Sequence, residues 1–238
     1  MAKNKKKQEE AEKYTGQELL ENPEAIADRL SKSEEFLEKN KVAVIGGSVA
    51  LIVAVGLFFF YQSFISGKDK TAQAEMFQAQ YYFEQDSLNL ALNGDGNSYG
   101  FLKIADEYGS TPAGKLANYY TGVIYLRQGE FDKAINTLKG FSPSDQLIQA
   151  KTYALIGDGY MEKKSYGDAL SYYQKAANYK ANKFFSPIYL KKAALAAELK
   201  GDLKTAKSSL ETIVNDYSDA NEYQEARKQL ARVNGMIN

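Results

Sequence analysis

The chain has 238 residues, and its 30 Lys and Arg balance its 30 Asp and Glu to give a formal net charge of zero. A balanced chain has no electrostatic reason to bind nucleic acid, so we predict no nucleic-acid partner. Cysteine and histidine are both absent, which excludes disulfides, thiolate metal sites and the commonest general base. We therefore predict a protein that is not an enzyme and that holds no cofactor and no metal.

The first segment, residues 1–41, is polar and rich in Lys and Glu. Asn22 followed by Pro23 is typical of the N-cap and first position of a helix. Apolar residues then recur at helical spacing, at Ile26, Leu30, Phe36 and Leu37. We predict an arm with a short amphipathic helix that is solvated; contact with lipid headgroups or with a partner is the alternative.

Residues 42–65 form an uncharged apolar segment, VAVIGGSVALIVAVGLFFFYQSFI. At 1.5 Å per residue this segment reaches about 36 Å as a helix, enough to cross a hydrocarbon core of about 30 Å. A cleaved signal peptide fits less well, because the segment is too long and no small-residue cleavage motif follows it. A helix buried in a soluble core would usually keep a polar stripe. We therefore predict a transmembrane helix over 42–65.

Basic residues around this segment predict its orientation. Nine Lys and Arg precede it, whereas only Lys68 and Lys70 follow it closely. This excess predicts a cytoplasmic N-terminus and places residues 66–238 across the membrane. Within the segment, Gly46, Ala50 and Ala54 recur at every fourth position and form a stripe where another membrane helix can pack closely. The alternative is that Gly and Ala are simply common in membrane spans.

In residues 66–238, apolar residues recur at spacings of three and four in segments that Gly, Ser-Pro or Asn-Asp clusters interrupt, which predicts an all-α domain. Two stretches superpose at an offset of 35 residues, and a third follows at an offset of 37. The matched positions are Gly122, Tyr125, Gly129, Phe131, Ala134 and Leu138; then Gly157, Tyr160, Lys164, Tyr166, Ala169 and Tyr173; then Ala194, Ala197, Gly201, Leu203, Ala206 and Leu210.

These positions resemble the tetratricopeptide repeat (TPR), which has small residues where paired helices touch and Gly in the turn. An earlier unit is indicated because Ile104, Tyr108 and Ala117 recur 109 positions later as Ile213, Tyr217 and Ala226. We expect a helix over 71–92 to pair with one over 99–108, and a last helix over 222–233 to cap the stack. The expected fold is all-α: a transmembrane helix, then a TPR-like solenoid of about four helix pairs with a C-terminal capping helix.

In such stacks the first helix of each pair lines the concave face, which predicts a groove from repeat position. Its expected residues are Leu116, Tyr119, Val123 and Leu126; Lys151, Ala154, Asp158 and Met161; and Ile188, Lys191, Leu195 and Glu198. This mixture of apolar, aromatic and charged side chains suits an unfolded peptide or a partner domain. The alternative for Tyr119 and Leu126 is that they pack against neighbouring helices.

The stretch 93–98, NGDGNS, is similar to a calcium-binding loop that starts at Asp95. Tyr99 stands where an oxygen ligand is needed, and Asp106 replaces the bidentate Glu. We therefore predict a simple turn between helices.

The whole layout has a Lys-rich start, one span near residue 50, and repeats carrying YGSTPAGKLANYYTGVIYLRQGEFDKA. It resembles the YfgM-type ancillary subunits of the SecYEG translocon. The stretch 108–117 is also similar to repeats of BamD and of Tol-Pal-associated proteins, which are lipid-anchored or secreted. The translocon resemblance implies a bacterial inner-membrane protein with a periplasmic domain over 66–238. It would act as a scaffold or chaperone in protein transport, beside SecYEG and a PpiD-type chaperone, on translocating or unfolded polypeptides. A scaffold for an envelope or secretion complex and a signalling adaptor are the alternatives.

Overall fold

The computed structural model describes residues 23–141 and 146–237. The chain divides into two compact units, Met1–Ser63 and Phe64–Asn238. Apart from one isolated bridge between Gly94 and Tyr99, every regular element in these described ranges is an α-helix. This confirms the predicted all-α class.

Helix α3 (Pro23–Lys39) begins at Pro23, the residue predicted to open a helix. The predicted N-cap, Asn22, lies outside the described residues. Helix α4 (Lys41–Glu84) follows and contains the apolar segment 42–65. In the part of the chain that the structure describes, α4 is the single helix long and apolar enough to cross a membrane, and its most apolar stretch is not buried by protein.

The structure corrects the expected division of this region into a helix over 42–65 and another over 71–92. Helix α4 is continuous for 44 residues. The intervening sequence, SGKDK, contains no proline and only one glycine, and an isolated glycine lowers helix stability without breaking the helix.

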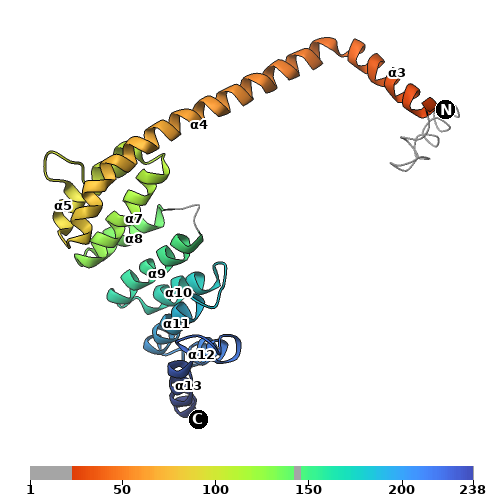
Figure 1. The fold of residues 1–238 in the computed structure, drawn as a ribbon. Coiled ribbons are helices and arrows are strands. Elements are labelled where there is room, and N and C mark those ends of the chain that lie inside the picture. Colours follow the sequence, from red (N-terminus) through yellow and green to blue (C-terminus); the bar gives the residue numbers. More distant parts are fainter. Residues whose placement is uncertain (1–22, 142–145, 238) are drawn as a thin grey trace. The chain divides into compact units, whose positions relative to one another are not determined.

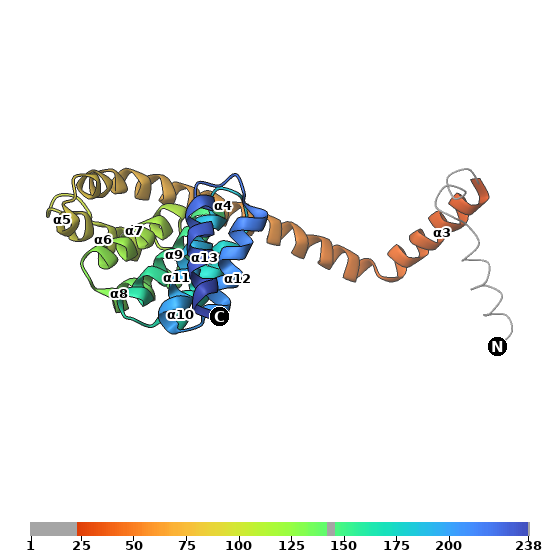
Figure 2. The ribbon, with the colours of Figure 1, turned by 90° about the horizontal axis from the view of Figure 1, so that it is seen from below.

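The remaining helices of Phe64–Asn238 follow one another as antiparallel neighbours (Figures 1 and 2). They are α5 (Leu88–Asn93), α6 (Phe101–Tyr108), α7 (Pro112–Arg127), α8 (Phe131–Lys139), α9 (Gln146–Glu162), α10 (Tyr166–Asn178), α11 (Ser186–Lys200), α12 (Leu203–Asp216) and α13 (Tyr223–Ile237). Three hairpins, α7–α8, α9–α10 and α11–α12, correspond to the three units predicted from the sequence. Helix α13 packs on α12 as the expected last helix and extends to Ile237.

Four turns of the repeat domain share one geometry, in which a residue with a left-handed backbone ends the first helix of a pair. These residues are Asp86, Gly129, Lys164 and Gly201, with φ of 56°, 77°, 58° and 85°. The next residue in each turn donates its backbone N–H to a carbonyl five positions earlier, which is the Schellman bond. The pairs are Ser87–Tyr82, Glu130–Tyr125, Ser165–Tyr160 and Asp202–Ala197, with N···O distances of 2.8–2.9 Å. The predicted repeat register is therefore confirmed.

The turn at Asp86 also shows why a single helix over 71–92 is wrong. Asp86 ends α4, because its left-handed backbone cannot continue a right-handed helix. The short α5 then leads into the loop at 93–98, and α6 completes the second helix of this first pair. Ile104 of α6 and Ile213 of α12 are both fully buried, as their matched repeat positions predict.

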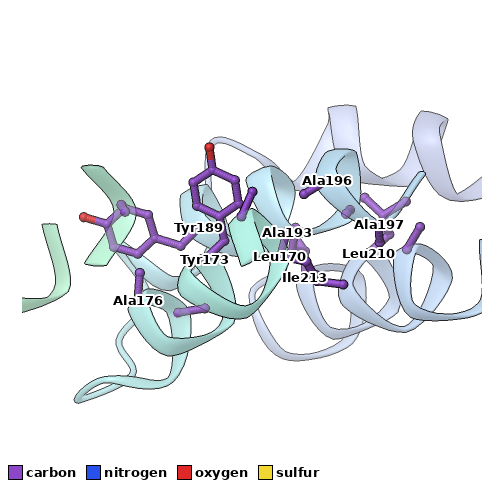
Figure 3. Packing of buried hydrophobic residues seen from close by; sticks show 14 of the residues in the cluster. Leu170, Tyr173, Ala176, Tyr189, Ala193, Ala196, Ala197, Leu210 and Ile213 are labelled. Carbon is purple, nitrogen blue, oxygen red and sulfur yellow. The ribbon is translucent and has the colours of Figure 1, made fainter. Parts of the chain in front are cut away.

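Small residues allow the paired helices to approach closely, as predicted. A Cβ atom added at Gly122 would lie 2.6 Å from the Leu138 side chain, and one at Gly157 would lie 2.7 Å from the Tyr173 ring. The matched alanines Ala134, Ala169, Ala194 and Ala206 are fully buried. Figure 3 shows the same principle in α11, where Ala193, Ala196 and Ala197 lie among side chains of α10 and α12.

The start of α7 has two caps, one of which comes from far away in the sequence. The Thr111 hydroxyl accepts a hydrogen bond from the Gly114 backbone N–H at 3.0 Å. The Asp69 carboxylate on α4 accepts one from the Ala113 N–H at 2.8 Å. A carboxylate at this place satisfies a free amide and also opposes the positive end of the helix dipole.

We expect the substitution Asp69→Ala to destabilise the repeat domain by about 1 kcal/mol, because it leaves the Ala113 amide without its acceptor. Urea unfolding of the full chain in mild detergent, followed by circular dichroism, measures this loss. Asp69→Asn is the matched control, since its side-chain oxygen can still accept the bond, and it should cost less. Equal stability of Asp69→Ala and the unchanged chain would contradict the long-range cap.

Candidate protein-binding groove

A groove of about 780 Å³ lies within the repeat domain, formed by α4, α7, α8 and α9. Helix α7 contributes most of its apolar lining, and α9 contributes both apolar and charged residues. The lining comprises Phe83 from α4; Tyr119, Tyr120, Val123, Leu126 and Arg127 from α7; Gly129 and Phe131 from the α7–α8 turn and α8; and Lys151, Leu155, Asp158 and Glu162 from α9.

The structure brings together five of the predicted groove residues. Tyr119, Val123, Leu126, Lys151 and Asp158 all line this groove. They lie there because the first helices of successive repeat pairs, α7 and α9, contact each other side by side. The geometry therefore places the middle of the predicted surface in one continuous depression.

The other predicted residues lie outside this groove. Leu116 packs against the clusters around Ile104 and Leu138, and Met161 and Ile188 pack against the α10–α11 core. Ala154 is buried in that same core, Lys191 is half-buried, Leu195 is exposed, and the Glu198 carboxylate pairs with Arg232 at 2.6 Å.

Aromatic rings build one wall of the groove as an interlocked set. The Tyr120 ring stacks on Phe101 with centroids 4.8 Å apart and meets the Phe83 ring edge-on at 5.1 Å. Tyr119 contacts Phe141 at 5.5 Å and is only 8% exposed. Burial raises the pKa of the Tyr119 hydroxyl to about 12, so this side chain stays neutral at physiological pH. Tyr119 therefore both packs against neighbouring helices and lines the groove.

Charged groups sit at fixed places around this apolar lining. The Arg127 guanidinium lies 4.6 Å from the centre of the Phe83 ring and 3.3 Å from the Asp86 carboxylate. The Asp158 carboxylate accepts hydrogen bonds from the Tyr173 hydroxyl and the Lys192 ammonium, both at 2.6 Å. Burial, together with the adjacent Asp158 charge, raises the pKa of Tyr173 well above its ordinary value. Both charges are therefore held by partners before any ligand arrives, which lowers the ordering cost of binding.

Several groove residues were not predicted from repeat position. Tyr120 and Leu155 each follow a predicted position, 119 and 154, by one residue, because the groove takes in a wider face of the helix than the four positions considered. Phe83 lies near the end of α4, and the sequence pattern wrongly extends this helix to residue 92. Arg127 and Glu162 lie next to the α7–α8 and α9–α10 turns, where a periodic helical pattern gives no signal. Phe131 is a matched repeat position, but its position in the repeat does not predict that it lines the groove.

The loop at 93–98 is a turn between helices, as predicted. The Asp95 carboxylate accepts the backbone N–H of Asn97 at 2.9 Å and of Ser98 at 2.7 Å, and it also accepts the Tyr82 hydroxyl at 2.8 Å. These hydrogen bonds, that from Ser98 first, hold the pKa of Asp95 below its ordinary value. The Asp95 carboxylate, which stands at the first ligand position of the calcium-like loop, thus links the 93–98 loop to Tyr82 of α4.

The predicted membrane-packing residues Gly46, Ala50 and Ala54 lie on α4 and are exposed. Nothing lies within 4 Å of a Cβ atom placed on Gly46. Close packing of another membrane helix on this stripe stays a prediction.

No family model and no curated protein sequence matches this chain. Among solved structures it is similar to a crystal structure of nearly identical TPR-like repeats, from a Podosopora anserina protein named as a kinesin light chain. The TM-score is 0.55 at 13% sequence identity, over 71% of this chain and 88% of that one. This similarity confirms the TPR-like fold predicted from the repeat pattern.

Proposed function

We propose that this protein is a membrane-anchored scaffold whose repeat domain binds segments of other proteins. The observation that carries this proposal is the groove between α7 and α9, which combines aromatic and aliphatic lining with prepositioned charges. Tyr, Phe and Arg are enriched where protein interfaces concentrate their binding energy. Helix α4 supplies the anchor, since its apolar segment is long enough to span a bilayer.

The specific setting that we propose is the bacterial inner membrane beside the SecYEG translocon. The excess of basic residues before the span supports a cytoplasmic N-terminus and a periplasmic repeat domain. The resemblance of the layout to YfgM-type subunits supports a PpiD-type chaperone as a partner and translocating or newly exported polypeptides as clients. In this role the protein binds and shields its clients and catalyses no reaction.

A photo-crosslinking amino acid at position 151 tests the groove, because Lys151 is exposed and lines it. The matched control is the same amino acid at position 77, since Phe77 is exposed on α4 but does not line the groove. We expect position 151 to capture protein partners at least about tenfold more efficiently than position 77. Introducing a charge with Val123→Glu should reduce the capture by a similar factor while the helical circular-dichroism spectrum is retained. Equal capture at positions 77 and 151 would contradict binding in this groove.

The identity of the captured proteins then tests the proposed translocon setting separately from the proposed scaffold function. Translocon subunits, a PpiD-type chaperone and exported polypeptides are the expected products after purification in mild detergent. Components of an outer-membrane assembly or of a signalling complex would refute the translocon assignment and leave the groove as a protein-binding site. Protease shaving of intact inner-membrane vesicles checks the orientation independently.

A further inference from the structure

The loop between α10 and α11, residues 179–185, exposes two neighbouring phenyl rings. Phe184 is 68% exposed and Phe185 is 39% exposed. Large adjacent apolar side chains at a loop tip are unusual on a surface that faces only water, because loop tips are ordinarily polar. This exposed pair therefore indicates a second contact surface, separate from the groove.

The backbone of this loop presents the two rings in a fixed arrangement. The Asn182 side-chain oxygen accepts hydrogen bonds from the backbone N–H groups of Phe184 and Phe185, both at 3.0 Å. The buried Ser186 hydroxyl donates to the Ala177 carbonyl at 2.8 Å and accepts from the Asn182 N–H at 2.9 Å. The tip is thus tied to the end of α10 and needs no ordering before it makes a contact.

In the sequence, the residues on both sides of the rings carry only positive charge. No acidic residue occurs between Asp168 and Glu198, whereas that interval contains Lys175, Lys180, Lys183, Lys191 and Lys192. Lys192 is engaged by Asp158. Within the described ranges, neither the Lys180 nor the Lys183 ammonium is paired with a carboxylate, and Lys183 lies 5.5 Å from the centre of the Phe184 ring. Two exposed rings with two available ammonium groups match the chemistry of an anionic lipid surface.

The topology of the repeat domain puts this loop at the edge where the chain enters it. Asp69 caps the start of α7, so the entry of the chain and the α6–α7 turn lie together. Because successive helices run in opposite directions, the α6–α7, α10–α11 and α12–α13 connections all fall at that edge. Figure 1 shows the last two projecting on the same side of the stack. The apolar segment 42–65 directly precedes this edge in the sequence.

We propose that the 179–185 loop docks on an anionic lipid bilayer, with its phenyl rings among the headgroups and its lysines on lipid phosphates. This second contact uses the anchoring proposed above but none of the protein partners. The span keeps the loop near the lipid at high effective concentration, so a weak contact suffices to hold it there. The α12–α13 loop carries Asp219 and Glu222, whose charge opposes such a surface and confines the contact to the α10–α11 loop.

The sequence contains no tryptophan, so one introduced tryptophan reports on its own surroundings. The full chain with Phe184→Trp is reconstituted in vesicles of phosphatidylcholine and phosphatidylglycerol in equal amounts, and quenching by brominated lipid is measured. Leu199→Trp is the matched control, because Leu199 is 49% exposed and lies near the opposite end of α11. We expect quenching at position 184 to exceed that at position 199 at least about threefold.

A pair of charge reversals, Lys180→Glu with Lys183→Glu, should bring the quenching at position 184 down to that at position 199. Vesicles of phosphatidylcholine alone should have the same effect. Equal quenching at positions 184 and 199 in the anionic vesicles would overturn the proposal. So would a blue shift at position 184 that requires an added protein partner, because the rings would then be a protein-docking site. Neither outcome affects crosslinking from position 151, so this proposal and the groove fail independently.

Discussion

Replacing Gly114 with alanine is expected to destabilise the repeat domain by about 3 kcal/mol, because the new methyl group has no space. Its Cβ would overlap the Tyr108 carbonyl group and lie 2.8 Å from the Gly109 nitrogen. The Tyr108 carbonyl oxygen accepts hydrogen bonds from both the Thr111 N–H and the Thr111 hydroxyl, each at 2.8 Å. Since Thr111 is itself fully buried, the carbonyl cannot move aside without breaking the capped turn.

Gly235→Ala is the matched control for this substitution. Gly235 also lies in a helix, but nothing is within 4 Å of the position of its added Cβ. The exchange should leave stability unchanged or raise it by up to about 1 kcal/mol, because alanine is the better helix former. Urea unfolding of both variants in the same detergent gives the comparison. If Gly114→Ala unfolds at the same denaturant concentration as Gly235→Ala, the close approach of the α6–α7 turn to α7 is wrong.

Replacing Ala169 with leucine is the second substitution for which we expect a large loss, of about 1–3 kcal/mol. Ala169 is completely buried on α10, at the repeat position matched by Ala134 and Ala206. Leucine adds three carbon atoms at a helix crossing that already holds Leu170 and Tyr173 in the same core. The surrounding helices must separate or the side chain must leave its preferred rotamer, and both reduce stability.

Thermal unfolding followed by circular dichroism measures this loss. Ala231→Leu makes the same chemical change on the exposed face of α13 and should alter the midpoint little. A midpoint for Ala169→Leu that equals that of Ala231→Leu would show that position 169 is not at a tight crossing. The repeat register derived from the sequence would then lose its main energetic support.

The repeat register could be predicted because helix crossings and left-handed turns restrict which residues fit. Gly122 and Gly157 lie beneath Leu138 and Tyr173 at distances that a side chain would not allow. Gly129 and Gly201 occupy turns with positive φ, where glycine costs least. The equivalent turn at Asp86 escaped prediction because Asp also tolerates this conformation and is common elsewhere.

The groove could be predicted only in part, since it is built by tertiary contacts as well as by periodicity. Val123 and Asp158 follow from their repeat positions. Phe83 becomes part of the lining only because α4 packs on α6 and α7, through Met76 and Ala79 among others. The capping bond from Asp69 to Ala113 spans 44 positions, and no local pattern in the sequence indicates that these residues meet.

The contacts of the repeat domain run mainly between helices adjacent in the chain, with further links from α4 and α5 to α7 and from α7 to α9. Such a stack has limited cooperativity, because the unfolding free energy is close to a sum of local terms and terms between neighbours. Loss of structure should therefore begin at α13, which packs mainly on α12, and advance helix by helix. The α7–α9 region is flanked by packed helices on both sides, so a protein segment can stay bound there while the end of the stack frays and re-forms.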